Sequence, residues 1–117
     1  MKANTKNLSK LFKALSDENR LRILLAIRSS NYRCRGARQQ CGAGETCVKE
    51  LAKSLEITVP TVSHHVKELI GVGLVSTRKE GRWVYCRIGE DAFDEALKFL
   101  GFVGFLGDFQ PNKRRKR

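Results

Sequence analysis

The stretch ELAKSLEITVPTVSHHVKELIGVGLVSTRKEGRWVYCRI, residues 50–88, decides the fold of this chain. Its apolar residues recur at helical spacing before and after the short link EITVP, which predicts two helices joined by a tight connection. Pro60 suits the first turn of the second helix, because the N–H that proline lacks has no partner there in any helix. Gly71 and Gly73 favour the end of that helix, since glycine readily adopts the left-handed conformation that closes a helix.

The end of this stretch, GLVSTRKEGRWVYCRI, predicts a β-hairpin. Glu80 and Gly81 supply the turn between two runs of β-prone residues. Side chains alternate along a strand, so one face of the second strand is expected to hold Val84, Cys86 and Ile88. Two short helices followed by such a hairpin form the layout of a winged helix-turn-helix, and the second helix is its candidate reading helix.

Further helices are expected on both sides of this unit. Apolar residues at helical spacing predict a first helix over roughly residues 5–15, and Ser16 and Asp17 are candidate caps for a second, ENRLRILLAI. The second helix is apolar on most sides, which places it at the centre of the core. A last helix is expected to begin near Asp91. The predicted fold class is therefore mainly α with a small β-hairpin (α+β), a winged helix-turn-helix.

The length of 117 residues suits one compact domain. We expect that domain to span residues 1–110, with a cysteine-containing insertion at residues 30–47, and residues 111–117 to form a basic tail. No apolar run approaches the ~20 residues that span a bilayer, and the N-terminus lacks the apolar core of a signal peptide, so a cytoplasmic location is expected. Thiols stay reduced there, so four cysteines indicate metal binding or redox chemistry rather than a disulfide framework.

The net charge of +11 favours a polyanionic partner, and nucleic acid is the first candidate. A solvated face is the ordinary explanation for polar residues on one helix, but the helix pair, the basic hairpin tip and the net charge together favour DNA. The side chains of the reading helix expected to contact DNA are Thr61, Ser63, His64, His65 and Lys67. The hairpin residues expected to contact backbone phosphates are Arg78, Lys79 and Arg82.

An enzyme and an RNA-binding module are the alternatives from other classes. Cysteine–histidine catalysis needs the two side chains within hydrogen-bonding reach, but both histidines fall on the reading helix. RNA modules stack bases on exposed aromatic residues of a sheet, and this chain offers only Trp83 and Tyr85 on a hairpin. Double-stranded DNA is therefore the expected partner, and no catalytic residue is expected.

Three segments, SDENRLRIL, PTVSHHVKEL and GLVSTRKEGRWVYCRI, closely resemble the ArsR/SmtB family of arsenic- and metal-responsive repressors. The resemblance covers roughly residues 8–90. It implies a homodimer that forms mainly through the first and last helices. It also implies a repressor that occupies an operator until a metal or metalloid binds, after which the DNA is released.

The cysteines indicate where such an ion would bind. Family members that sense arsenite or soft metals often carry a motif like ELCVCDLC, and the matching residues here are ETCVKELA. Cys47 matches the first cysteine, whereas Lys49 and Ala52 occupy the places of the other two. The insertion brings Cys34 and Cys41 just upstream. We therefore expect a relocated site in which Cys34, Cys41 and Cys47 bind As(III) or Sb(III), with Cd(II), Pb(II) and Zn(II) as alternatives and no organic cofactor.

A redox switch is the second hypothesis for the same cysteines. Neighbouring arginines favour the thiolate form of Cys34 and Cys41, and this pair can close a disulfide or polysulfide bridge in a sensor of oxidants or reactive sulfur. Incidental thiols in a glycine-rich polar loop are a further alternative. Cys86 is a different case, because its strand face is shared with apolar residues, and we expect it to be a small buried core residue.

Overall fold

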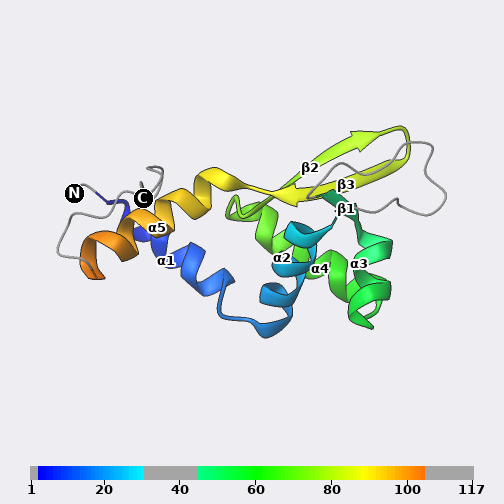
Figure 1. Cartoon of the computed structure of the whole chain (residues 1–117), viewed down its shortest axis with the longest axis horizontal. Helices are drawn as coiled ribbons and strands as arrows, with labels where there is room; N and C mark the ends of the chain where they lie inside the picture. The colour runs from blue at the N-terminus through cyan, green and yellow to red at the C-terminus, as the bar shows by residue number, and fades with distance from the viewer. Residues whose placement is uncertain (1–2, 31–44, 105–117) are drawn as a thin grey trace, which may run out of the picture.

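The computed structural model describes residues 3–30 and 45–104. Within these residues the chain forms five helices and a three-stranded antiparallel sheet (Figure 1). The helices are α1 (Thr5–Ala14), α2 (Glu18–Ser29), α3 (Val48–Leu55), α4 (Val59–Gly71) and α5 (Glu90–Gly104). The strands are β1 (Glu45–Cys47), β2 (Val75–Glu80) and β3 (Trp83–Ile88). The fold class predicted from the sequence, mainly α with a small sheet, is confirmed.

Local chemistry sets the boundaries of the helix pair α3–α4. The side-chain oxygen of Thr58 accepts a hydrogen bond from the backbone N–H of Thr61 at 3.3 Å, which caps α4. Pro60 lies in the first turn of α4, as predicted. Glu56, directly after α3, has a φ of 58°, and this left-handed conformation ends the helix. The tight connection expected from the sequence is therefore built by one left-handed residue and one capping threonine.

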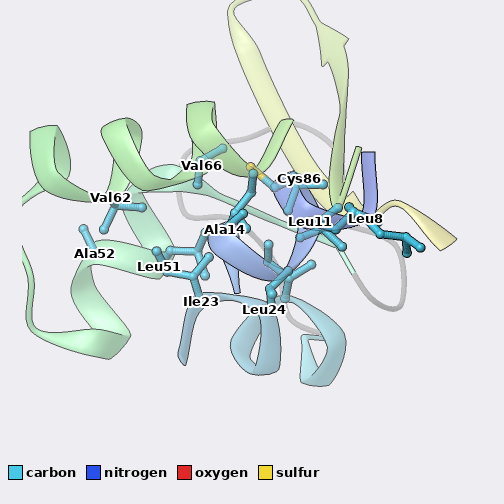
Figure 2. Packing of buried hydrophobic residues seen from close by; sticks show 14 residues of the cluster. Leu8, Leu11, Ala14, Ile23, Leu24, Leu51, Ala52, Val62, Val66 and Cys86 are labelled. Carbon is cyan, nitrogen blue, oxygen red and sulfur yellow. The ribbon is translucent and has the colours of Figure 1, made fainter. Parts of the chain in front are cut away.

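The core lies where α1, α2, α3 and α4 meet the hairpin strands (Figure 2). Ile23 of α2, Leu51 of α3 and Val62 of α4 are fully buried there. Cys86 of β3 belongs to the same cluster and is also fully buried. The prediction that Cys86 is a small core residue is confirmed, because its thiol replaces an aliphatic group in a packed interior.

Helix α2 differs from its prediction. Asp17 caps it as expected and accepts a hydrogen bond from the backbone N–H of Arg20 at 3.2 Å. One side of the helix lies in the core, whereas Leu21 and Leu25 on the other side are 44% and 69% exposed. The expectation of a helix covered on nearly all sides is therefore wrong for a single chain, because apolar composition does not reveal which neighbours are close enough to cover it.

The sheet contains a strand that was not predicted from the sequence. Strand β1 pairs with β3, which also pairs with β2, so the order is β1–β3–β2. The consecutive residues Tyr85 and Cys86 point to opposite faces of the middle strand, and both are buried, so both faces are covered there. Val84 shares a face with Cys86 but is 37% exposed, so the predicted apolar face does not extend to it.

The hairpin turn lies one residue further along the chain than predicted. Glu80 is the last residue of β2 and pairs with Trp83, so Gly81 and Arg82 form a two-residue turn. Gly81 has a φ of 60°, and a first turn residue with positive φ favours glycine in hairpins of this length. The glycine therefore sets the register of the hairpin β2–β3, which we call the wing.

Helices α1 and α5 pack side by side, away from the helix pair α3–α4 (Figure 1). The ring centroids of Phe12 and Phe99 lie 5.9 Å apart with the ring planes inclined by 55°, a tilted aromatic pair. Helix α5 nevertheless keeps four large apolar side chains exposed in the single chain. They are Leu97, Leu100, Phe102 and Val103.

Candidate DNA-binding surface and thiol site

Helix α4 presents a polar surface opposite its buried side. Its core-facing residues are Val62, Val66 and Leu69. Three of the five side chains predicted to contact DNA from this helix are exposed, and these are Ser63, His64 and Lys67. They supply a hydroxyl, an imidazole and an ammonium group, which can bond to base edges and phosphates in a major groove.

The other two predicted residues of α4 are half-buried and have partners within the chain. The hydroxyl oxygens of Thr61 and Thr58 lie 2.8 Å apart and share a hydrogen bond. The Nδ1 atom of His65 accepts a hydrogen bond from the Nε–H of Arg20, on α2, at 3.2 Å. His65 therefore keeps its second ring nitrogen for a contact with DNA, whereas the hydroxyl of Thr61, its single side-chain polar group, already shares one hydrogen bond inside the protein.

The three wing residues that were predicted to contact phosphates fall into two groups. Lys79 and Arg82 are exposed near the tip. Arg78 is different, because its guanidinium donates to Glu45 at 2.9 and 3.1 Å and to Glu80 at 2.6 Å. These hydrogen bonds, that to Glu45 first, raise the pKa of Arg78 above its ordinary value. Arg78 thus has a structural role within the chain, since two carboxylates already neutralise its charge, and its expected phosphate contact stays a prediction.

Aromatic packing reinforces this role of Arg78. The guanidinium carbon lies 4.5 Å from the centroid of the Tyr85 ring, a cation–π distance. Glu45 also forms a longer ion pair with Arg87, of 3.7 Å. Its side chain is only 6% exposed, so the carboxylate depends on these arginines for compensation of its charge.

Cys47 lies where two elements meet. It is the last residue of β1 and the residue that precedes α3, and it is buried. In the sheet register Cys47 is opposite Tyr85, whereas Cys86 is opposite Thr46. Residues directly opposite share a face, so the two cysteines point to different faces of the sheet. Burial first, and the nearby Cys47 second, raise the pKa of Cys86 to about 11, which disfavours its thiolate form.

Two of the three predicted ligands, Cys34 and Cys41, lie outside the described residues. Among the residues that are described, no three histidine, cysteine or acidic side chains are grouped in a way that could hold a metal ion. Cys47 is thus the described member of the predicted set. A site of three thiolates would need both cysteines of the insertion in addition.

Sequence reasoning missed two residues that support these surfaces, Arg20 and Glu45. Both are ordinary charged residues in sequence, with nothing that separates them from solvated ones. Their partners lie 45 and 33 positions away along the chain. The sequence signal that could have revealed Glu45 was the strand before the helix pair. That strand has three residues, too few for the alternation of side chains along a strand to be recognised.

Residues 40–77 match the family model described as "Bacterial regulatory protein, arsR family". A relative from Staphylococcus aureus, the cadmium resistance transcriptional regulatory protein CadC homolog, is 33% identical over 105 residues. The matched region covers 90% of this chain and 73% of the relative. The chain belongs to the ArsR family.

A second relative of this ArsR-family chain is the arsenical resistance operon repressor of Staphylococcus aureus. It is 31% identical, with 84% of this chain and 81% of the repressor covered. A crystal structure of an ArsR family transcriptional regulator superposes with a TM-score of 0.69 at 26% identity, and the match covers 91% of this chain and 95% of that one.

The winged helix-turn-helix prediction is confirmed by these structures. A homodimeric winged helix-turn-helix DNA-binding domain from Mycobacterium bovis shares the fold, with a TM-score of 0.61 at 24% identity over 97% of this chain and 89% of that domain. Membership of the ArsR family makes the chain a transcriptional regulator that binds DNA, and not an enzyme. None of the described helices combines the length and apolar character needed to cross a membrane.

Proposed function

We propose that this ArsR-family chain is a homodimeric repressor that leaves its operator when a thiophilic ion binds its cysteine thiolates. The observation that carries the proposal is the polar surface of α4, where Ser63, His64 and Lys67 are exposed opposite a fully packed side. A helix of this kind beside a basic wing, on a chain of net charge +11, suits a major groove and its flanking phosphates.

In the proposed complex the exposed residues of α4 contact base edges, together with the second ring nitrogen of His65 and the hydroxyl of Thr61, which can form a further hydrogen bond. Lys79 and Arg82 contact phosphates beside the groove. Arg78 is left out of the DNA contacts, because its guanidinium is engaged by Glu45 and Glu80. Phosphate contacts release counterions, so the affinity should fall steeply as salt is raised.

The proposed dimer forms through α1 and α5. The exposed apolar side chains of α5 support it, because monomeric proteins seldom leave such a group in water. The homodimeric domain from Mycobacterium bovis shares the fold and supports the same assembly. Two copies of α4 would then meet a two-fold-symmetric operator in successive major grooves.

The proposed effector is a soft ion held by Cys34, Cys41 and Cys47. As(III) and Sb(III) are our first choice, with Cd(II), Pb(II) and Zn(II) as alternatives, and the cadmium and arsenical resistance regulators among the relatives support an ion of this class. Cys47 ends β1 and precedes α3, so a ligand that pulls on it acts on the helix that supports α4. The effector lowers DNA affinity if it binds better to the conformation that fits DNA less well.

A redox switch is the second candidate function. Cys34 and Cys41 would close a disulfide or polysulfide bridge, with an oxidant or a reactive sulfur species as the oxidising partner. This alternative uses the same segment but does not need Cys47. The two candidates are therefore separated by a variant that lacks Cys47 alone.

The experiment is DNA release followed by fluorescence anisotropy. The probe is the duplex upstream of the chain's own gene, under reducing conditions, titrated with arsenite, antimonite, Cd(II), Pb(II) and Zn(II). Cys34→Ser, Cys41→Ser and Cys47→Ser should each lose release, while Cys86→Ala, the matched control on the opposite face of the sheet, should keep it. Release by a persulfide or peroxide but by none of the ions would favour the redox switch. A wild-type protein that never binds the duplex would refute operator binding at this site.

A further inference from the structure

We infer that Arg20 is a positioning residue for DNA recognition: it holds His65 in the tautomer that carries its proton on Nε2. His65 thereby offers a hydrogen-bond donor, and not an acceptor, to DNA. The inference deepens the proposed function and rests on it for the DNA contact. The tautomer itself is a property of the free protein and can be measured separately.

The geometry joins the first turn of α2 to the middle of α4. The Nε atom of Arg20 donates to Nδ1 of His65 over 3.2 Å, and both side chains are half-buried. The backbone of Arg20 is itself held, because its N–H donates to the Asp17 carboxylate that caps α2. The bond therefore connects a fixed point near the helix start to a side chain of the reading helix.

The chemistry of the two groups leaves one arrangement of protons. The Nε atom of an arginine always carries hydrogen, because the guanidinium stays charged at every ordinary pH. Nδ1 of His65 must then supply a lone pair, and the single proton of a neutral imidazole lies on Nε2. A protonated imidazole would set an N–H of Nδ1 against the N–H of Arg20 and place two positive charges together.

Charged or titratable groups lie near the His65 ring on both helices. Arg20 and Asp17 face it from the start of α2, and the pKa of Asp17 is lowered first by the hydrogen bond from the Arg20 backbone N–H. His64 lies beside it on α4, with the ring centroids 5.6 Å apart. The Arg20 bond is the contact that distinguishes the two ring nitrogens of His65, since it reaches Nδ1 specifically.

This proton arrangement predicts what His65 can recognise. An Nε2–H donor bonds to acceptors, which in the major groove are guanine N7 and O6, adenine N7 and thymine O4. It cannot bond to the amino groups of cytosine or adenine, which are themselves donors. A phosphate oxygen is an acceptor of the same chemical kind, and DNA variants separate it from a base edge.

The first test measures the tautomer in the free protein by long-range ¹H–¹⁵N correlation spectra of ¹⁵N-histidine, at about pH 8, above the ordinary histidine pKa of about 6.5. We expect His65 to be in the Nε2–H form and Arg20→Met, which keeps the length but removes the donor, to produce a mixture. Arg20→Lys should restore part of the preference. Arg28→Met is the matched control, because this exposed arginine of α2 pairs with Glu90 and not with a histidine.

Two spectroscopic results would overturn the inference. One is a wild-type His65 that is mixed or has its proton on Nδ1. The other is a tautomer that stays unchanged in Arg20→Met while that variant remains folded.

The second test measures binding to a duplex selected by the wild-type protein from a random-sequence library. Arg20→Met should weaken binding about three- to tenfold in the wild-type background and have no further effect in His65→Ala. Equal weakening in both backgrounds, with a salt slope reduced by about one, would identify Arg20 as a direct phosphate contact and overturn the inference.

Base-pair substitutions in that duplex identify the acceptor. A preference that His65→Ala relaxes at one base pair supports a base edge, and a loss that is equal for all sequences supports a phosphate oxygen. Both results agree with a donor at Nε2. A wild-type protein that selects no duplex would refute the proposed function, whereas the spectra of the free protein would still decide the tautomer.

Discussion

Arg78 of the wing and Glu45 of β1 share two hydrogen bonds, 3.1 Å from Nε and 2.9 Å from Nη2. The two residues are separated by 33 positions, and the carboxylate is almost completely buried. Glu45 lies two residues before Cys47, the residue that precedes the support helix α3. The bidentate pair therefore connects the wing to β1, the strand that leads into the helix pair. A displacement of β1 would consequently displace the wing.

The first prediction concerns the stability that this pair provides. Glu45→Gln keeps the shape of the side chain but removes the charge that faces Arg78 and Arg87. We expect the free energy of unfolding to fall by about 1–3 kcal/mol, because bonds between charged groups are lost at a buried site. Glu80→Gln changes a side chain that is 40% exposed, so it should lower the free energy of unfolding by no more than a few tenths of a kcal/mol. Urea denaturation measures both, and equal losses would contradict the prediction.

The second prediction separates the basic residues of the wing by the salt dependence of DNA binding. Lys79→Ala and Arg82→Ala should each weaken binding to all sequences alike and reduce the salt slope by about one, because each removes a phosphate contact. Lys6→Ala on α1 is the control for the loss of one charge. Anisotropy titrations at several salt concentrations give the slopes, and unchanged slopes in both wing variants would rule out these contacts.

The third prediction follows from the pKa of Cys86, which burial raises from 9.0 to about 11. Below both values the thiol is protonated in the folded and the unfolded chain, so this group adds no pH dependence to the free energy of unfolding. Above about pH 9 the unfolded chain releases this proton while the folded chain keeps it, so the free energy of unfolding falls by up to about 1.4 kcal/mol per pH unit. Cys86→Ala should lack this part of the fall.

The measurement for Cys86 is urea denaturation of both proteins at about pH 8 and about pH 10. Other groups titrate in the same range in both proteins, so the difference between them isolates the thiol. We expect the stability advantage of the wild type over Cys86→Ala to shrink by roughly 1 kcal/mol. An advantage that is the same at both pH values would show that the thiol is not held in its protonated form.

The fourth prediction concerns the proposed dimer. Leu100→Lys places a charge on α5 at a side chain that is 51% exposed in the single chain, so the fold of one copy should survive. The dimer should weaken at least tenfold, because burial of a charged side chain in an apolar interface is costly. Light scattering during gel filtration measures the mass. Val84→Lys on the wing, at a side chain 37% exposed, is the control and should leave the dimer intact.

Much of the fold was predictable because its signals are local. Thr58 and Pro60 mark the start of α4 through capping and proline stereochemistry, and Gly81 marks the wing through its positive φ. Strand β1 was not predictable, since three residues form a strand only because β3 lies beside them. The exposure of Leu25 was also missed, because a sequence states that a residue is apolar but not which surface covers it.

The sequence by itself determined the helix pair, the wing and the outward position of Ser63, His64 and Lys67, because spacing within one helix decides which side chains oppose the apolar ones. The tertiary structure alone decided that Arg78 bonds to Glu45 and that Arg20 bonds to His65. Both pairs join residues dozens of positions apart. A charged side chain is free or engaged according to what folding brings next to it, and no local pattern carries that information.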